Sequence, residues 1–161
     1  NKDNQPNVRM VLLKGLSDRG FVFFTNFNSK KGSELKENLK ASMCFHWKSL
    51  RRQVRVIGSV EEVTKKEADD YYNSRPYKNR ISAWASSQSQ TLDKRNTFLE
   101  KIREFEKKYP DESNVPRPPH WSGWRVIPDE IEFWVDGEGR IHERLNYKIK
   151  DGKWEKELLY P

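Results

Sequence analysis

The C-terminal part of the chain consists of short β-favouring runs separated by turn-forming residues, and this pattern constrains the fold most strongly. The runs lie at about 124–127, 131–135, 140–149 and 153–159. The last two are joined by Asp151-Gly152, a dipeptide typical of two-residue hairpin turns. Strands joined by turns this short pair antiparallel, because a parallel crossover needs a dozen or more residues. We therefore predict antiparallel sheet for this part.

The preceding part of the chain adds four predicted strands, at 8–14, 21–25, 41–47 and 53–63. Gly58 lies inside the last of these runs, and a glycine within a strand pattern indicates a β-bulge. The total of six to eight strands shows no alternation of strand and helix of the kind that builds a doubly wound sheet. The predicted fold class is mainly β with inserted helices, as a mostly antiparallel β-barrel or sandwich.

Helices are predicted between these strands. Ser29 is placed to cap a helix that starts with two lysines, and Thr64 to Glu67 has the spacing of a capping box. The second helix should stop near Ser74, because the residue before a proline disfavours helix. A short helix is predicted within 77–89. The longest should begin at Asp93 and carry an apolar packing stripe, formed by Phe98, Ile102, Phe105 and Tyr109.

Length, charge and cysteine content narrow the class of protein. The 161 residues fit one domain, 1–161, and the net charge of +7 favours anionic ligands such as phosphorylated small molecules, nucleic acid or acidic membranes. Cys44 is the only cysteine, so no intramolecular disulfide and no zinc site are expected. We expect a cytoplasmic protein without metal, and no apolar run approaches the roughly 20 residues that span a bilayer.

Residues 134–144 are predicted to form a hairpin around a glycine-containing turn. Because strand side chains alternate with period two, Arg140, His142 and Arg144 should share one face. Two guanidiniums and an imidazole repel one another unless an anion or an electron-rich ring lies against them. Alternatively, this face is the solvated side of an edge strand, where cations oppose aggregation. The pattern alone leaves both interpretations open.

Eight separated segments, in this order and spacing, resemble the pyridoxine/pyridoxamine 5′-phosphate oxidase family. They are Arg9-Met-Val-Leu-Leu-Lys14, Phe24-Thr-Asn26, Ser29-Lys-Lys-Gly32, Arg52-Gln-Val-Arg-Val56, Tyr71-Tyr-Asn-Ser-Arg-Pro76, Ser87-Gln-Ser89, Glu132-Phe-Trp134 and Arg140-Ile-His-Glu-Arg144. The likeness runs from Arg9 to Pro161. It implies an FMN-binding split β-barrel that works as a homodimer, with FMN at the subunit interface and with C-terminal dimerisation and substrate hairpins at about 121–161.

The resemblance also implies an activity, the oxidation of pyridoxine or pyridoxamine 5′-phosphate to pyridoxal 5′-phosphate with O₂ as electron acceptor and hydrogen peroxide as product. The implied FMN-binding residues are Arg9, Met10, Val11, Leu12, Leu13, Lys14, Phe24, Thr25, Lys30, Lys31, Gln53, Gln88, Ser89, Trp134 and Arg144. The implied substrate-binding residues are Lys14, Tyr71, Arg75, Asn79, Arg140, Ile141 and His142. Of these, Arg140 and His142 are the implied catalytic pair.

This sequence departs from the family pattern in three places. Lys30 stands where the family usually has Arg, so a bidentate phosphate contact is replaced by a point charge. Asn79 stands where a Ser commonly donates to the substrate phosphate, a role that an amide N–H can fill. The family also has an upstream strand and an N-terminal segment that folds over the substrate, and neither precedes Asn1 in this sequence.

Two other functions fit the sequence less well. Another split-barrel FMN protein, such as a flavin reductase, would bind the same cofactor and act on a different substrate. A basic β-barrel could instead bind single-stranded nucleic acid by stacking bases on its aromatic side chains. The basic residues lie in short separated motifs and not along one continuous stripe, so neither nucleic acid nor membrane is an expected partner.

Overall fold

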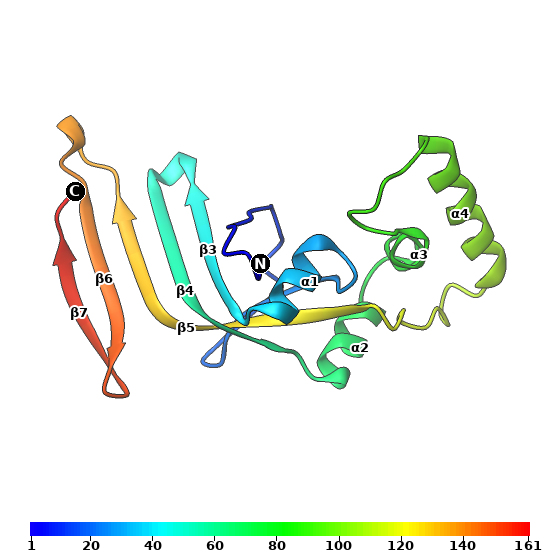
Figure 1. Cartoon of the computed structure of the whole chain (residues 1–161), viewed down its shortest axis with the longest axis horizontal. Coiled ribbons are helices and arrows are strands. Elements are labelled where there is room, and N and C mark those ends of the chain that lie inside the picture. Colours follow the sequence, from blue (N-terminus) through cyan, green and yellow to red (C-terminus); the bar gives the residue numbers. More distant parts are fainter.

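Strand β5 (Trp121–Val135) is the element on which the sheet is assembled in the computed structural model, which describes all 161 residues (Figure 1). One side of β5 pairs with β4 (Arg52–Glu62). Its other side pairs first with β2 (Gly20–Asn26) and then with β6 (Glu143–Lys150). A single continuous strand therefore joins the two ends of the sheet.

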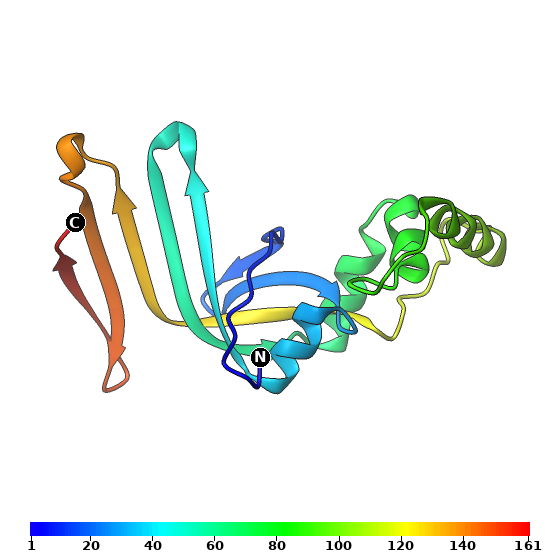
Figure 2. The same ribbon diagram turned by 45° about the horizontal axis from the view of Figure 1, so that its top comes forward.

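The remaining strands extend this arrangement to seven, and every pairing is antiparallel. β1 (Gly15–Ser17) pairs with β2, β3 (Lys40–Trp47) with β4, and β7 (Lys153–Leu159) with β6. Figures 1 and 2 show β4 and β5 bending along their length, so that the part beside β6 turns away from the part beside α2. The predicted fold class is confirmed.

A β-bulge accompanies this bend. Gly58 pairs with Pro128 and Ile57 with Glu130, which leaves Asp129 as the extra residue on β5. A Cβ at Gly58 would lie 1.9 Å from the Ile127 carbonyl oxygen, so the two strands approach too closely there for any side chain. The bulge predicted at Gly58 is confirmed. The predicted separation of 124–127 from 131–135 is wrong, because the bulge accommodates Pro128 and the pairing continues on both sides.

Four helices are inserted between the strands: α1 (Lys30–Glu37), α2 (Lys65–Asn73), α3 (Tyr77–Ala85) and α4 (Arg95–Lys108). The predicted cap of α1 is present, with Ser29 accepting from the Gly32 N–H, and both bonds of the Thr64 capping box are made. α4 begins at Arg95, two residues later than predicted. Its apolar stripe faces α3, where the rings of Phe105 and Trp84 lie 5.7 Å apart. No helix is both long and apolar enough to cross a membrane.

The core lies where β2, β4 and β5 meet α1. Six side chains form its buried cluster, in which the Phe27 and Trp124 rings stack with centroids 4.8 Å apart. The cluster consists of Phe23, Phe27, Val56, Val60, Trp124 and Val126. Burying these side chains contributes roughly 1.5–3 kcal/mol each to the free energy of folding.

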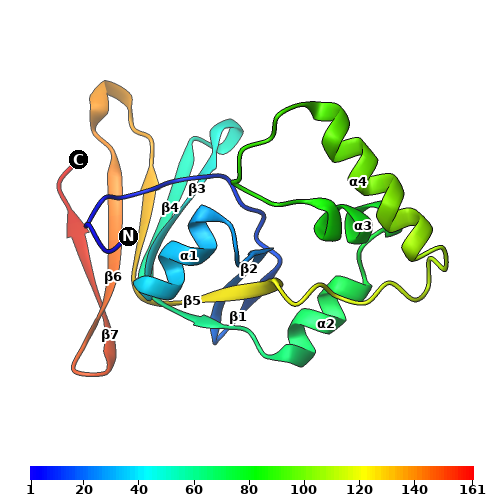
Figure 3. The ribbon, with the colours of Figure 1, turned by 45° about the vertical axis from the view of Figure 1, so that its right-hand side comes forward.

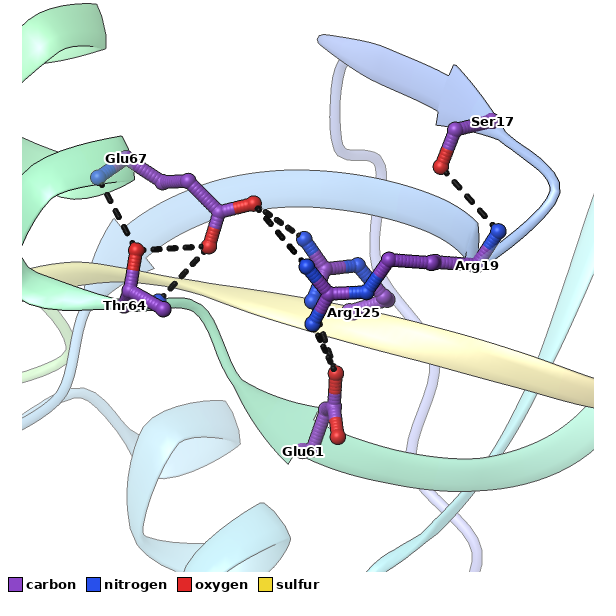
Figure 4. A network of polar contacts seen from close by, with 6 residues as sticks. All are labelled: Ser17, Arg19, Glu61, Thr64, Glu67 and Arg125. Atoms are coloured by element: carbon purple, nitrogen blue, oxygen red, sulfur yellow. Dashed lines mark hydrogen bonds and ion pairs between the residues drawn. The ribbon is translucent and has the colours of Figure 1, made fainter.

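A buried arginine connects the sheet to the start of α2 (Figure 4). Arg125 of β5 is 3% exposed and pairs with Glu61 of β4 at 2.7 Å and with Glu67 of α2. Arg19, in the turn after β1, lies 3.2 Å from the same Glu61 carboxylate. Glu67 also accepts from the Thr64 N–H, so the capping box and the ion pair share one carboxylate. The first turn of α2 is therefore fixed to two neighbouring strands.

The strand predicted at 8–14 is not formed. These residues are extended, but Lys14 N–H to Val22 O, at 2.8 Å, is the only backbone bond that ties them to β2. Val8 and Met10 are 93% and 94% exposed. A β-favouring run becomes a strand only where a neighbouring strand pairs with it, and no other strand of this chain lies alongside.

The C-terminal hairpins follow the prediction in part. Asp151 and Gly152 both have positive φ, 50° and 75°, as the predicted two-residue turn requires. The strand predicted over 140–149 begins only at Glu143, because a 3₁₀ turn, η2 (Glu138–Arg140), occupies the preceding residues. Arg140 has φ 65° and lies outside the sheet.

We expect Gly58→Ala to destabilise the fold by about 2–3 kcal/mol, because the new methyl group would overlap the Ile127 carbonyl and force β4 and β5 apart. Urea unfolding followed by tryptophan fluorescence measures this change. Gly15→Ala is the matched control, since a Cβ there meets only the Val22 side chain at 3.3 Å, and its effect should stay within about 1 kcal/mol. Equal effects of the two substitutions would contradict the proposed role of the bulge.

Candidate functional site

A pocket of about 370 Å³ lies between the extended segment before β1, strand β2, and helices α1, α2 and α3. Many of the predicted cofactor and substrate residues line it, namely Arg9, Met10, Val11, Leu12, Lys14, Phe24, Thr25, Lys31, Tyr71, Arg75 and Gln88. Four of these side chains are cationic, and no Asp or Glu lines the pocket. The pocket therefore has an uncompensated positive charge that fits an anionic ligand.

One group of pocket residues comes from the start of α1 and the end of β2. The Lys31 ammonium donates to the Thr25 hydroxyl, which donates to the Gln88 carbonyl oxygen at 3.3 Å. Burial, together with the charge of Arg9, lowers the pKa of Lys31 to about 8. The protonated form of Lys31 is thus disfavoured until an anion compensates both charges.

A second group comes from the end of α2 and contains a stack of aromatic rings. The Tyr71 ring lies 4.1 Å from Phe24, and Phe24 lies 5.2 Å from Trp121. Arg75 follows α2 and places its guanidinium 4.8 Å from the Trp121 ring centre. Its Nη1 is buried and has no hydrogen-bond partner, and Lys14 lies over the Tyr71 ring at 5.8 Å. A buried donor without a partner marks a place for an acceptor.

A second cluster of predicted residues lies at the other end of β5. Trp134 pairs with Gln53 of β4 on one side and with Arg144 of β6 on the other. The His142 ring lies 4.7 Å from the Trp134 ring. Figures 1 and 3 show β6 and the end of β5 at one end of the molecule and α2 and α3 at the other. Within one chain, the predicted site is therefore divided into two separate clusters.

The three residues predicted to share a strand face are arranged differently. Only Arg144 lies in β6, where it donates to both Glu132 carboxylate oxygens, at 2.9 and 3.1 Å, and to the Tyr160 carbonyl. Arg140 and Ile141 are exposed and precede the strand. His142 turns toward Gly137 and Asp136. The prediction of a common face is wrong because the chain forms a 3₁₀ turn where a regular strand was expected.

Four other predicted residues lie outside both clusters or at their margin. Leu13, Lys30, Asn79 and Ser89 are exposed, and none lines the pocket. Lys30 and Lys31 are consecutive in α1, so their side chains point in different directions and only Lys31 reaches the pocket. Asn79 lies in the first turn of α3, whereas Ser82, one turn later, lines the pocket.

Sequence reasoning missed several residues that the structure brings to these clusters. Asn26, Ser86 and Trp121 line the pocket, and Asn26 donates to the Ser86 carbonyl at 3.2 Å. Asp136 and Glu132 lie beside the second cluster. The polar run after Trp84 gave a signal for Ser86. For Glu132, which is 4% exposed, the signal was a carboxylate placed between the apolar residues Ile131 and Phe133. No three His, Cys, Asp or Glu side chains gather in a way that could hold a metal ion.

We expect Glu132→Gln to remove a pH-dependent part of the stability. Hydrogen bonds from Arg144, together with the charge of Arg55, hold the pKa of the Glu132 carboxyl below its usual value. The stabilisation is therefore complete above about pH 4.5 and is lost as the pH falls through the lowered pKa. Above that pH the substitution should cost about 2 kcal/mol.

Urea unfolding at several pH values between 3 and 7 measures this difference. The wild type and Glu132→Gln should converge toward acid pH. Glu130→Gln is the matched control, because Glu130 lies on the same strand and pairs only with Lys148 at 3.3 Å. A constant difference between wild type and Glu132→Gln at every pH would contradict the assignment.

Comparisons with known proteins agree over nearly the whole chain. Residues 1–109 match the family model described as pyridoxamine 5′-phosphate oxidase, and residues 121–161 match the pyridoxine 5′-phosphate oxidase C-terminal dimerisation region. The chain is 59% identical over 161 residues to a pyridoxine/pyridoxamine 5′-phosphate oxidase of Pelagibacter ubique, covering 99% of this chain and 77% of that protein. It is 54% identical to the enzyme of the same name from Agrobacterium fabrum, covering 97% and 76%.

Solved structures show the same fold. PhzG from Burkholderia lata, in complex with tetrahydrophenazine-1-carboxylic acid, superposes with a TM-score of 0.92 at 30% identity, covering 99% of this chain and 77% of that one. A pyridoxamine 5′-phosphate oxidase-related, FMN-binding protein from Nostoc punctiforme gives a TM-score of 0.73 at 17% identity, covering 95% and 80%. The second likeness supports the fold alone.

Proposed function

The chain belongs to the pyridoxamine 5′-phosphate oxidase family, and on that premise we propose that it oxidises pyridoxamine and pyridoxine 5′-phosphate to pyridoxal 5′-phosphate, with FMN as cofactor and O₂ as electron acceptor. The observation that carries the proposal is the pocket with four cations and no carboxylate. Both the cofactor and these substrates bear a phosphate that such a pocket would neutralise.

The residues present fit FMN. Lys31 and Arg9 lie close enough that their charges disfavour one another, and a phosphate dianion between them would relieve this repulsion. Thr25 and Gln88 offer neutral hydrogen-bonding groups beside them. FMN, when bound, accepts a hydride from the substrate and passes its electrons to O₂.

Lys14, Tyr71 and Arg75 are the residues we assign to the substrate phosphate. The buried Nη1 of Arg75 would gain the acceptor that the protein does not supply. Stacking of Tyr71 on Phe24 and of Arg75 on Trp121 limits the rotation of both groups. A phosphate held in this way fixes the position of the whole substrate. The substrate and the cofactor are then already aligned before they react, so the reaction step becomes effectively unimolecular.

A homodimer would complete the site. Gln53, Trp134, His142 and Arg144 lie at the other end of β5 from the pocket, so they would meet a cofactor there only if a partner subunit supplied them. The apolar side chains of Phe133, Ile141 and Leu158 near this cluster are 43%, 75% and 81% exposed, as a subunit interface would require. We assign dimerisation to residues of 121–161, and the single unpaired Cys44 supports a cytoplasmic location.

In such a dimer, the partner subunit's Arg140 and the partner subunit's His142 would cover the pyridine ring of the substrate. Arg140 is exposed and has no partner of its own, so its guanidinium is free to donate to the ring substituents. Arg144 is already bound to Glu132, and it would act near FMN as a fixed positive charge. We propose these roles for Arg140, His142 and Arg144.

We expect the affinity for FMN to fall as the pH rises above about 8. The pKa of Lys31 is lowered to about 8, and a bound phosphate favours the protonated form, so binding takes up a proton in this range. Fluorescence titration with FMN between pH 7 and 10 measures the effect. Lys31→Met should bind more weakly and lose the pH dependence, whereas Lys30→Met should keep it. An unchanged profile in Lys31→Met would contradict this role.

The proposed function is tested by adding pyridoxamine 5′-phosphate to the FMN-loaded protein without oxygen. The expected result is that the flavin band bleaches without oxygen as the aldehyde forms, and that the band returns, with release of hydrogen peroxide, when O₂ is admitted. Pyridoxamine without its phosphate is the control substrate and should bleach the flavin far less. A flavin that bleaches with a reduced nicotinamide, and not with the phosphorylated amine, would indicate the flavin reductase alternative.

We expect Arg75→Met to raise the KM for pyridoxamine 5′-phosphate about 10- to 100-fold, because a charge-assisted contact to the phosphate is lost. Steady-state peroxide production measures the change. Arg95→Met is the matched control, since Arg95 is exposed in α4 and lines no pocket, and it should leave KM unchanged. Similar KM values for both variants would argue against a phosphate site at α2.

A further inference from the structure

The first half of β5 faces the core on one side and helix α2 on the other. Trp124 and Val126 belong to the buried core cluster. Positions 121, 123 and 125 therefore lie on the opposite face, because the side chains of a strand alternate with period two. At Arg125 the strand is paired with β2 on one side and with β4 on the other. The position of this arginine backbone is thus fixed by two neighbouring strands.

Helix α2 presents a matching row of side chains to this face. Glu67 and Tyr71 lie in α2 and Arg75 follows its C-cap, at intervals of four residues, so all three lie on one side of the helix. Glu67 pairs with Arg125 at one end of the row, and the Arg75 guanidinium lies 4.8 Å from the Trp121 ring centre at the other. The helix therefore runs antiparallel to this part of β5.

The middle contact of the row is made over Gly123. Phe24 of β2 pairs with Gly123, and a Cβ at Gly123 would lie 2.9 Å from two carbons of the Phe24 ring. The Phe24 ring thus lies over the glycine, and Tyr71 stacks on this ring at 4.1 Å. Two residues of strand advance about 6.8 Å and four residues of helix about 6 Å. The three contacts therefore repeat at nearly the same interval on both elements.

The ion pair between Glu67 and Arg125 holds the end of α2 that lies away from the pocket (Figure 4). Arg125 is 3% exposed and uses Nη1 for Glu61 and Nη2 for Glu67. Glu67 also uses both of its oxygens, since Oε1 accepts from Arg125 and Oε2 accepts from the Thr64 N–H at 2.8 Å. Loss of one carboxylate would leave part of a buried charge uncompensated. Glu67 therefore joins the first turn of the helix to a fixed point on the sheet.

We propose that Glu67 is a positioning residue for the substrate phosphate: its ion pair with Arg125 sets the position of α2 along β5 and so places Tyr71 and Arg75 in the pocket. Glu67 itself does not line the pocket, and it makes the only ion pair between α2 and β5. A small displacement of Arg75 would move the bound phosphate, and with it C4′ of the substrate. This inference rests on the proposed function for its kinetic consequence, whereas its structural consequence is independent of turnover.

Glu67→Gln separates the ion pair from the helix cap. Glutamine has a single side-chain oxygen, which can keep the bond from the Thr64 N–H, as in other capping boxes, but its NH₂ group then faces Arg125. We expect KM for pyridoxamine 5′-phosphate to rise about tenfold. The dissociation constant of FMN should stay within about twofold, because the proposed contacts to the FMN phosphate lie outside α2. For pyridoxamine without its phosphate, kcat/KM should not change.

Glu61→Gln is the matched control, because it removes the other carboxylate from the same buried arginine. The Glu61 and Glu67 side chains are similarly exposed, at 41% and 37%. Glu61 lies on β4, which the backbone pairing holds to β5 without the ion pair. Both variants should therefore lower the midpoint of urea unfolding, but only Glu67→Gln should raise KM. Hydrogen exchange of the FMN-loaded proteins should be faster over residues 65–75 in Glu67→Gln than in Glu61→Gln.

A double substitution tests whether the effect passes through Arg75. In the Arg75→Met background, adding Glu67→Gln should raise KM by less than about twofold, because the main residue that Glu67 positions is already lost. Where Glu67→Gln does not fold, Glu67→Asp takes its place. This variant keeps the charge on a side chain that is one methylene shorter, so its KM should lie between those of the wild type and of a variant without the ion pair.

Three results would overturn the inference: equal KM values for Glu67→Gln and Glu61→Gln, an equal rise in KM with and without Arg75, or equal exchange over residues 65–75 in the two single variants. A wild type that binds FMN but does not oxidise pyridoxamine 5′-phosphate would defeat the proposed function instead. The exchange rates would then still decide whether Glu67 holds α2 in place on β5.

Discussion

The whole arrangement depends on β5 remaining hydrogen-bonded along its full length. Its first half pairs with β2 and carries Trp121 at the pocket, and its second half pairs with β6 and carries Trp134 at the other cluster. The bulge at Asp129, opposite Gly58, lets the strand bend without losing either set of pairings. One strand therefore sets the distance and direction between the two parts of the candidate site.

Electrostatics differ sharply between the two ends of this strand. The pocket is lined by four cationic side chains and by no carboxylate, so the protein itself does not neutralise its positive charge. The four cations are Arg9, Lys14, Lys31 and Arg75. At the other end, Arg144 and Arg55 share buried Glu132, and Arg51 binds Asp136. The first end is suited to bind phosphates, whereas the second is suited to hold side chains in fixed positions. This division is consistent with an enzyme in which one region anchors and the other orients.

Much of the secondary structure, with its caps, bulge and turns, could be predicted from the sequence, because these features are determined by residues close together in the chain. The capping box at Thr64, the cap at Ser29, the bulge at Gly58 and the turn at Asp151 each depend on a few adjacent residues. The resemblance supplied the list of pocket residues, which no local pattern could have assembled. The errors arose where partners decide the outcome. Residues 8–14 lack a pairing strand, and the turn after β5 is shaped by Arg51, which lies far away in sequence.

The extended segment before β1 has a consequence for how the pocket responds to its ligands. Arg9 and Lys14 are carried by backbone that makes almost no hydrogen bonds to the sheet, and such segments open at little free-energy cost. A phosphate that binds both this segment and α1 would link a weakly held part of the chain to a well-packed one. Occupancy of the pocket would then raise the resistance of this segment to proteolysis. Release of the cofactor and local unfolding of the segment would be thermodynamically coupled, so that each favours the other.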